Sequence, residues 1–308
     1  MAAEDLDPLL ATVPGHTSTY GDPVALDWLD ELGLSADGPP WLSMGLRRVD
    51  DDGWLLTDDQ REAELALRAR LVRERPGEVL HLTADTQDAG AEVLELVTAW
   101  LAARDVEVGP AHAADEHPLV TAGRLVQEDL CLMVPRPDVD TVVRHHLDAA
   151  VLCFPSHWRL ADKAGRPAAA LHGPVPGYDV ELADRVDRYL ARLRPGAIGV
   201  RRNWSVHDSP ELFAPDPPTE ARPATAAEVP ERLWLRSERQ TLRALPESGS
   251  VLFTIRVQQT PFGALAQRPQ VASALADRLR AQPAELTAMN GLTLHHQAVL
   301  TWLDGLAP

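Results

Sequence analysis

One segment near the C-terminus constrains the fold more than any other. In SVLFTIRVQ, residues 250–258, two sets of side chains alternate at every second position, and one set is wholly apolar, which is the period of a β-strand. Similar patterns predict strands in five earlier segments: LVTAGRLVQEDLCLMV at 119–134, DAAVLCFP at 148–155, PAAALH at 167–172, IGVRRNWSV at 198–206 and RLWLRSE at 232–238. The strands are therefore expected after about residue 118.

Helical patterns flank and interrupt these strands. A capping-box sequence at 57–60 opens an apolar run that stops at Pro76–Gly77, and 3/4 spacing predicts helices at 88–104, 179–194 and beyond 267. Strands and helices do not alternate regularly, and no dinucleotide or P-loop fingerprint follows a strand, so a doubly wound nucleotide-binding fold is disfavoured. We expect an α+β fold in three parts that form one compact unit: a mostly helical acidic layer at 1–110, an antiparallel-sheet core at 111–264 and a helical tail at 265–308.

Charge and hydropathy limit the classes of partner and the cellular location that we expect for this chain. The chain has 29 Lys and Arg against 46 Asp and Glu, a formal net charge of −17, so nucleic acid binding is not expected. Residues 1–60 hold 13 acids against 2 arginines, a local balance of −11, which is either a solvated face or a docking surface for a basic partner. No apolar run reaches the roughly 18–20 residues of a membrane helix, and the N-terminus lacks a basic signal region, so we expect a cytoplasmic protein.

The cysteine content excludes two kinds of metal centre. The only two cysteines, Cys131 and Cys153, lie in apolar runs, where a free thiol usually packs as a small buried hydrophobe. An all-cysteine iron–sulfur cluster needs four thiolates and a zinc knuckle needs several, so neither can be built by this chain alone.

Three clusters place ionisable groups inside apolar sequence. In the first, Gln127-Glu128-Asp129, strand alternation turns at least one carboxylate inward, where it must be paired. Its partner is either an arginine of a later strand or a substrate.

The second cluster, residues 154–178, offers His157, Trp158, Lys163 and His172. His172 ends an apolar run before a Gly-Pro break, so it is either a hydrogen-bonded structural residue or a ligand at a pocket rim. The adjacent pairs His145-His146 and His295-His296 are expected at the surface.

The third cluster, residues 201–208, reads as a strand with Arg202 and Trp204 on one face and Arg201 and His207 on the other. Arginine binds carboxylates bidentately and tryptophan supplies a stacking wall, so the first face is suited to a planar or anionic group. The alternative is a structural lock between this arginine and Glu128 or Asp129. No G-x-S-x-G elbow supports a serine hydrolase.

Taken in order, five motifs resemble the haem-dependent oxidative N-demethylase alpha-subunit family: VQEDLCLM, CFPSHWRLADKAGRP, LHGPVPGY, RRNWSV and LWLRSERQTLRALPESGSVLFTIR. The resemblance covers about residues 35–290. It implies a PAS-like fold, b-type haem, and O₂-dependent demethylation of a small alkylamine such as dimethylamine, with release of formaldehyde. It also implies separate reductase subunits that carry flavin and an iron–sulfur centre, which agrees with the cysteine content.

A haem gives the candidate residues specific roles. Histidine is the expected axial ligand of the iron, with His172 first, His157 second and His207 third. The anionic propionates of the haem are expected to bind Arg201, Arg202 or Arg256. Trp158, Trp204 or Phe253 would form a wall of the porphyrin or substrate pocket. A cationic amine would bind Glu128 or Asp129. Glu128, Asp129 and Trp158 are thus the expected catalytic residues.

Two other functions are compatible with the sequence. A haem-binding PAS-like sensor or carrier would bind the cofactor without turnover, since fold alone does not fix function. A structural or small-molecule-binding protein would use the arginine–carboxylate pairs only as architecture.

Overall fold

A computed structural model describes residues 23–34, 45–106, 108, 115–171, 180–218 and 222–306. Within these residues the strands form a seven-stranded antiparallel sheet in the order β1-β5-β6-β7-β3-β4-β2. The strands are β1 (Arg47–Val49), β2 (Leu80–Leu82), β3 (Asp129–Pro137), β4 (Val143–Val151), β5 (Ile198–His207), β6 (Trp234–Ala244) and β7 (Val251–Pro261). The fold is therefore α+β, as the sequence predicts.

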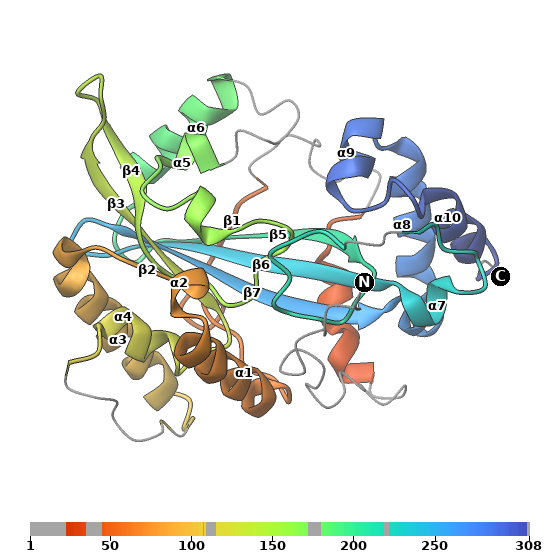
Figure 1. The fold of residues 1–308 in the computed structure, drawn as a ribbon, viewed down its shortest axis with the longest axis horizontal. Coiled ribbons are helices and arrows are strands. Elements are labelled where there is room, and N and C mark those ends of the chain that lie inside the picture. The colour runs from red at the N-terminus through yellow and green to blue at the C-terminus, as the bar shows by residue number, and fades with distance from the viewer. Residues whose placement is uncertain are drawn as a thin grey trace, which may run out of the picture.

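Helices cover both faces and one end of the sheet (Figure 1). Below the sheet in this view lie α1 (Arg61–Glu74), α2 (Pro76–Val79), α3 (Gln87–Ala102) and α4 (Pro118–Gly123). Above it lie α5 (Ala168–Leu171) and α6 (Val180–Arg192). At the far end lie α7 (Val229–Arg232), α8 (Pro269–Ala281), α9 (Ala284–Met289) and α10 (His296–Asp304). Short 3₁₀ turns complete the elements: η1 (Pro23–Glu31), η2 (Ala84–Thr86), η3 (Leu160–Asp162) and η4 (Phe262–Gln267).

Two apolar cores hold these layers together. The larger lies between the sheet and α1, α3 and α4, where Leu71, Val93 and Leu101 pack with Leu130 and Leu132. The smaller joins the turn η1 to α7, α8 and α10 through residues such as Leu29, Phe262 and Leu275. Each fully buried Leu or Phe side chain contributes roughly 1.5–3 kcal/mol of transfer free energy, so these cores fix the relative positions of sheet and helices.

Three strand predictions differ from the structure. Strands are predicted only after about residue 118, but the short edge strands β1 and β2 lie before it, in the segment expected to be a helical layer. The segment 119–134 begins as helix α4, because Pro118 occupies the first helical turn, and only from Asp129 is it a strand. PAAALH contains helix α5 instead of a strand, since a run of alanines is helix-favouring when no partner strand pairs with it.

The remaining predictions agree more closely with the structure. The helices predicted at 88–104 and 179–194 correspond to α3 and α6, and the tail beyond 267 is helical. The helix predicted after 57–60 begins at Arg61, but its N-cap is Gln60 and it has no side-chain cap. In the part of the chain that the structure describes, no helix has both the length and the apolar character needed to cross a membrane.

Candidate functional site

The two faces of the sheet differ in exposure. The face that carries Arg202, Arg239 and Arg256 packs against α1 and the loop before it; we call it the helical face. The opposite face carries Arg201, Asn203, Ser205 and His207 on β5, Glu238 and Gln240 on β6, Phe253 on β7 and Cys131 on β3; we call it the site face. Most of these side chains are half-buried, so the site face is the polar and partly open surface of the sheet.

The segment that follows β4 runs across the site face and is anchored by Asp129. The carboxylate of Asp129 accepts hydrogen bonds from the backbone N–H groups of Cys153 (2.7 Å) and Phe154 (3.1 Å) and pairs with Arg68 (2.7 Å). Both members of that ion pair are about 1% exposed. Asp129 is therefore committed to positioning residues 153–158, and its partner is an arginine of helix α1, not of a later strand.

Two histidines meet on the site face. The rings of His157 and His207 stack with centroids 4.5 Å apart, and the hydroxyl of Ser156 lies 2.9 Å from Nε2 of His207. His157 is exposed and has a φ of 55°, a left-handed conformation that is uncommon for a residue with a side chain. Its backbone N–H donates to the carbonyl of Ala214, which holds it in this conformation. Such conformations cluster at functional sites because the surrounding structure must stabilise them.

Arg236 lies on the same face of the sheet, at the position of β6 that pairs with Ser205. Its fully buried guanidinium donates to the carbonyls of Phe154 (2.8 Å) and Leu212 (3.2 Å), and so fixes two loops that border the site face. Burial and the Arg236 cation lower the pKa of His157, and the same two causes lower the pKa of His207 to about 2. Both imidazoles are consequently neutral at pH 7, and neutral imidazole is the form that ligates metals.

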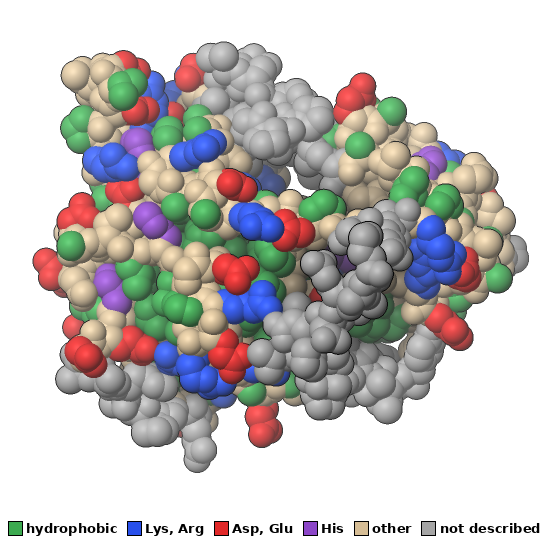
Figure 2. Space-filling view, in the orientation of Figure 1, with side chains coloured by type: hydrophobic (Ala, Val, Ile, Leu, Met, Phe, Trp, Pro, Cys, Tyr) green, Lys and Arg blue, Asp and Glu red, His purple; other side chains and the backbone are tan. Residues whose placement is uncertain are grey.

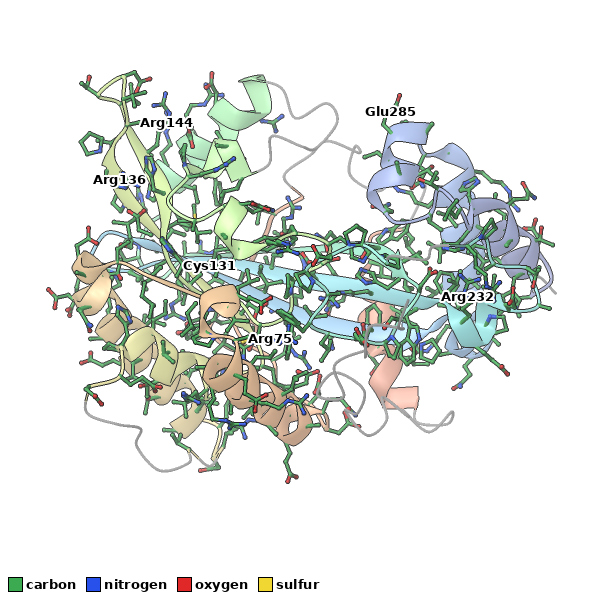
Figure 3. The ribbon with its side chains drawn as sticks, in the orientation of Figure 1. Arg75, Cys131, Arg136, Arg144, Arg232 and Glu285 are labelled. Atoms are coloured by element: carbon green, nitrogen blue, oxygen red, sulfur yellow. The ribbon has the colours of Figure 1, made fainter. Side chains whose placement is uncertain are left out.

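Trp158 and Lys163 follow His157 in the chain, and their side chains contact each other. The ammonium of Lys163 lies 4.0 Å from the centroid of the Trp158 ring. Burial lowers the pKa of Lys163, while Glu238, Cys131 and Asp162 act in the opposite direction. Figure 3 shows Cys131 near the middle of the sheet, on β3.

Glu238 is the acidic residue of the site face that the sequence analysis missed. Its carboxylate accepts hydrogen bonds from Asn203 (3.2 Å) and Gln240 (2.9 Å), both on the same face. The alternation of Arg236, Glu238 and Gln240 along β6 is the signal that could have found it, because three polar residues at every second position indicate a polar strand face.

Several predicted site residues lie on the helical face. Arg256 is 1% exposed and pairs with Asp58 (2.6 Å) and Glu64 (2.9 Å). Glu128 is equally buried and accepts from the N–H of Leu56 at 2.8 Å, and burial raises its pKa. The structure therefore does not bring Arg256 or Glu128 together with Trp158 and His157.

The Arg202–Trp204 pair also lies on the helical face. Arg202 donates to Gln258 (2.9 Å) and pairs with Glu31 (3.3 Å), so the alternative of a lock to Glu128 or Asp129 is wrong. Trp204 packs against the smaller apolar core. These two residues are separated from the site face by the sheet itself, because successive side chains of a strand point to opposite faces.

Three of the four histidines expected at the surface are buried. His145, His146 and His295 are 6%, 3% and 3% exposed. Nε2 of His295 lies 2.8 Å from the carboxylate of Asp208, and Nδ1 of His146 lies 3.2 Å from the carbonyl of Gly165. These polar partners offset part of the cost of burying His295 and His146. His172, the first choice for an iron ligand, lies outside the described residues.

The geometry defines an α+β protein with a partly open, polar sheet face walled by aromatic and imidazole rings. The side chains of the described residues are shown in the space-filling view (Figure 2). Residues 105–300 match the family model of the haem-dependent oxidative N-demethylase, alpha subunit-like. This span is more than half of the chain, and the protein belongs to that family.

The site face fits the cofactor that the family name specifies. Haem needs one axial side chain, and His157 offers a neutral, exposed imidazole whose ring nitrogens have no hydrogen-bond partner among the described residues. By contrast, His207 is 3% exposed and is already bonded to Ser156. Arg201 offers a cation for a propionate, and Trp158 and Phe253 offer apolar walls.

Proposed function

We propose that the protein binds haem b on the site face and uses it for oxidative N-demethylation of a small alkylamine. The observation that carries the proposal is the convergence of three family motifs, FPSHWRLADKAGRP, RRNWSV and LWLRSE, on one polar, partly open face of the sheet. The overall reaction consumes one O₂, two electrons and two protons, and yields the demethylated amine, formaldehyde and water.

The strand order supports a PAS-like core. Counted along the chain, β3, β4, β5, β6 and β7 lie in the spatial order 2-1-5-4-3, which is the order of a PAS sheet. The helical connection between its second and third strands contains α5 and α6, and these lie on the same side of the sheet as the site face. A ligand held between this connection and the sheet would contact Trp158 and Arg201.

An imidazole is proposed as the axial ligand, with His172 first and His157 second. His172 directly follows helix α5, and His157 stands on the site face in its neutral form. Arg201 is the proposed partner of a propionate, because it lies on the site face, whereas Arg202 and Arg256 lie on the other side of the sheet.

The residues around the haem would bind and orient the amine. The bound haem supplies the activation of O₂. Glu238 attracts the ammonium form of the substrate, and a carboxylate oxygen of Glu238 can accept its proton, which frees the nitrogen lone pair. Trp158 shields the site from water, and Lys163 holds a proton at Nζ beside it. We assign the amine-binding role expected of Glu128 or Asp129 to Glu238, because the half-buried Glu238 lies on the site face. Glu128 is buried on the helical face, and the carboxylate of Asp129 is bound to Arg68.

The electrons would come from a separate reductase. Both cysteines are buried, and the family name describes an alpha subunit, so flavin and an iron–sulfur centre are proposed to reside in partner subunits. The acidic segment 1–60 is a candidate docking region for them.

A turnover assay tests this function. The purified chain is loaded with hemin, supplied with O₂, NADPH and a competent flavin–iron–sulfur reductase, and incubated with dimethylamine. Amine-dependent formaldehyde is the expected product. A protein that binds hemin but releases no formaldehyde under these conditions would instead be a haem sensor or carrier. Failure to bind hemin would contradict both the demethylase and the sensor function.

A further inference from the structure

A pocket lies at the β1 edge of the sheet, away from Trp158 and the histidine pair. It has a volume of about 470 Å³ and is lined by residues of β1, of the C-terminal end of α6 and of the start of β5. The lining includes four arginines, Arg47, Arg48, Arg192 and Arg194. For a chain with a net charge of −17, a pocket lined by four cations and no acidic residue is a marked local reversal of charge.

The pocket follows from how α6 packs on the sheet. Tyr189 of α6 lies directly over Gly199, and a Cβ built at Gly199 would clash with the tyrosine hydroxyl. The absent side chain therefore lets the end of the helix approach β5. Arg48 is paired with Gly199 across the two strands, so its side chain lies on the same face, beside the end of α6.

The arginines of this pocket differ in availability. Arg47 points to the other face, where it pairs with Glu31 at 3.4 Å. Among the described residues, no carboxylate pairs with Arg48, Arg192 or Arg194, although most other arginines of the molecule do have such a partner. All three are exposed, so their guanidinium groups can be reached by a ligand from solution.

The balance of charge favours an anion. The C-terminal end of a helix carries about half a negative charge, which by itself repels anions. Arg48, Arg192 and Arg194 add three positive charges at the same place, so the pocket is cationic overall. Guanidinium groups bind phosphate oxygens through paired hydrogen bonds, and the apolar side chains of Leu46 and Leu193 line the remaining wall.

We propose that this pocket binds a small phosphate-bearing molecule, with its phosphate on Arg48, Arg192 and Arg194 and its carbon skeleton against Leu46 and Leu193. The volume is within the range of small-molecule sites. The proposal is independent of the haem chemistry. Gly199 is nevertheless two residues from Arg201 on the same face of β5, so a ligand here would adjoin the site face.

Calorimetric titration of the full-length protein, with and without hemin, tests the pocket. The probes are adenosine 5′-monophosphate, inorganic phosphate and, as the uncharged comparison, adenosine. Saturable binding of the monophosphate is expected, with adenosine at least tenfold weaker. The double variant Arg192→Ala/Arg194→Ala should bind the monophosphate at least tenfold more weakly than the wild type.

Helix α6 supplies a matched control. Arg185→Ala/Arg188→Ala removes the same amount of charge from α6 itself, outside the pocket, and should leave monophosphate affinity unchanged. Three results would overturn the proposal: no saturable binding of either phosphate probe, equal weakening by both double variants, or loss of hemin uptake in Arg192→Ala/Arg194→Ala, which would assign these arginines to the haem. Circular dichroism of each variant verifies that the fold is retained.

Discussion

The imidazole of His157 stacks on that of His207, with ring centroids 4.5 Å apart and the planes inclined by 24°. One ring is exposed and the other is 3% exposed, so the buried histidine forms the support of the accessible one. Burial and the cation of Arg236 lower the pKa of both imidazoles. The pair therefore presents a neutral imidazole at the edge of the site face, in a backbone conformation fixed by Ala214.

The buried ring gives folding a defined pH dependence. The pKa of His207 is lowered from 6.5 to about 2, so below pH 6.5 the unfolded chain binds a proton that the native chain cannot bind. Stability from this group is complete above pH 6.5 and falls as the pH decreases, by at most about 1.4 kcal/mol per pH unit. The free energy of unfolding of the wild type should therefore fall by about 2 kcal/mol between pH 7 and pH 5 because of this group. Replacement of His207 by Gln, which keeps a hydrogen-bonding partner for Ser156, should abolish that part of the decrease.

Urea denaturation at pH 7 and pH 5 measures this difference. The comparison is between the wild type and the variant, because other groups contribute equally to both. Equal pH dependence of the two proteins would show that His207 is protonated in the folded state.

Asp129→Asn tests the anchor of the segment that crosses the site face. The substitution leaves the buried guanidinium of Arg68 without its carboxylate, and loss of one member of a buried pair costs about 3–5 kcal/mol. We expect a destabilisation of this size in urea denaturation. Glu62→Gln on the exposed side of α1 should change stability by less than about 0.5 kcal/mol. A similarly small effect of Asp129→Asn would contradict the positioning role.

Glu238→Gln tests the proposed amine-binding group. The variant keeps the size and hydrogen-bonding capacity of the side chain but removes its charge, so the amine-induced change in the haem spectrum should require at least about tenfold more amine, or ~1.4 kcal/mol. Glu231→Gln, an exposed residue just before β6, is the matched control and should behave as the wild type. If Glu128→Gln weakened the amine and Glu238→Gln did not, the original assignment from the sequence would be correct.

The two thiols should be unreactive in the folded protein. Cys131 and Cys153 are 3% and 0% exposed, and burial raises the pKa of Cys153 to about 12 and that of Cys131 further. Since the thiolate is the reactive form, a disulfide reagent such as DTNB should titrate no thiol under native conditions and both in denaturant. Rapid reaction of either cysteine without denaturant would contradict the packing around Asp129.

Much of the sheet could be predicted from the sequence, for a physical reason. In β5, β6 and β7 the hydrophobic period of two is carried over many residues, and strand alternation is a local property of the sequence. PAAALH was assigned to a strand because four apolar residues have no distinctive period, and in such a short run the tertiary environment decides between helix and strand.

The candidate site could be predicted only in part. Trp158 and His157 were found because they lie in a motif, but which strand face becomes the open one depends on where α1, α3 and α4 pack. Arg201 and Glu238 lie on the open face, whereas Arg202 and Glu128 do not. The sequence of one strand shows which residues share a face but cannot show which face is open. The partner of Asp129 was missed for the same reason, since Arg68 lies 61 residues earlier in the chain.

Hemin titration followed by the Soret absorbance tests the central claim that the site face binds haem. The wild type should saturate with one hemin per chain. Replacement of the axial histidine, His172→Ala or His157→Ala, should abolish or shift the Soret band, whereas Arg243→Ala on the opposite face should bind hemin as the wild type does. No hemin uptake by the wild type, or an unchanged spectrum in both histidine variants, would contradict the account.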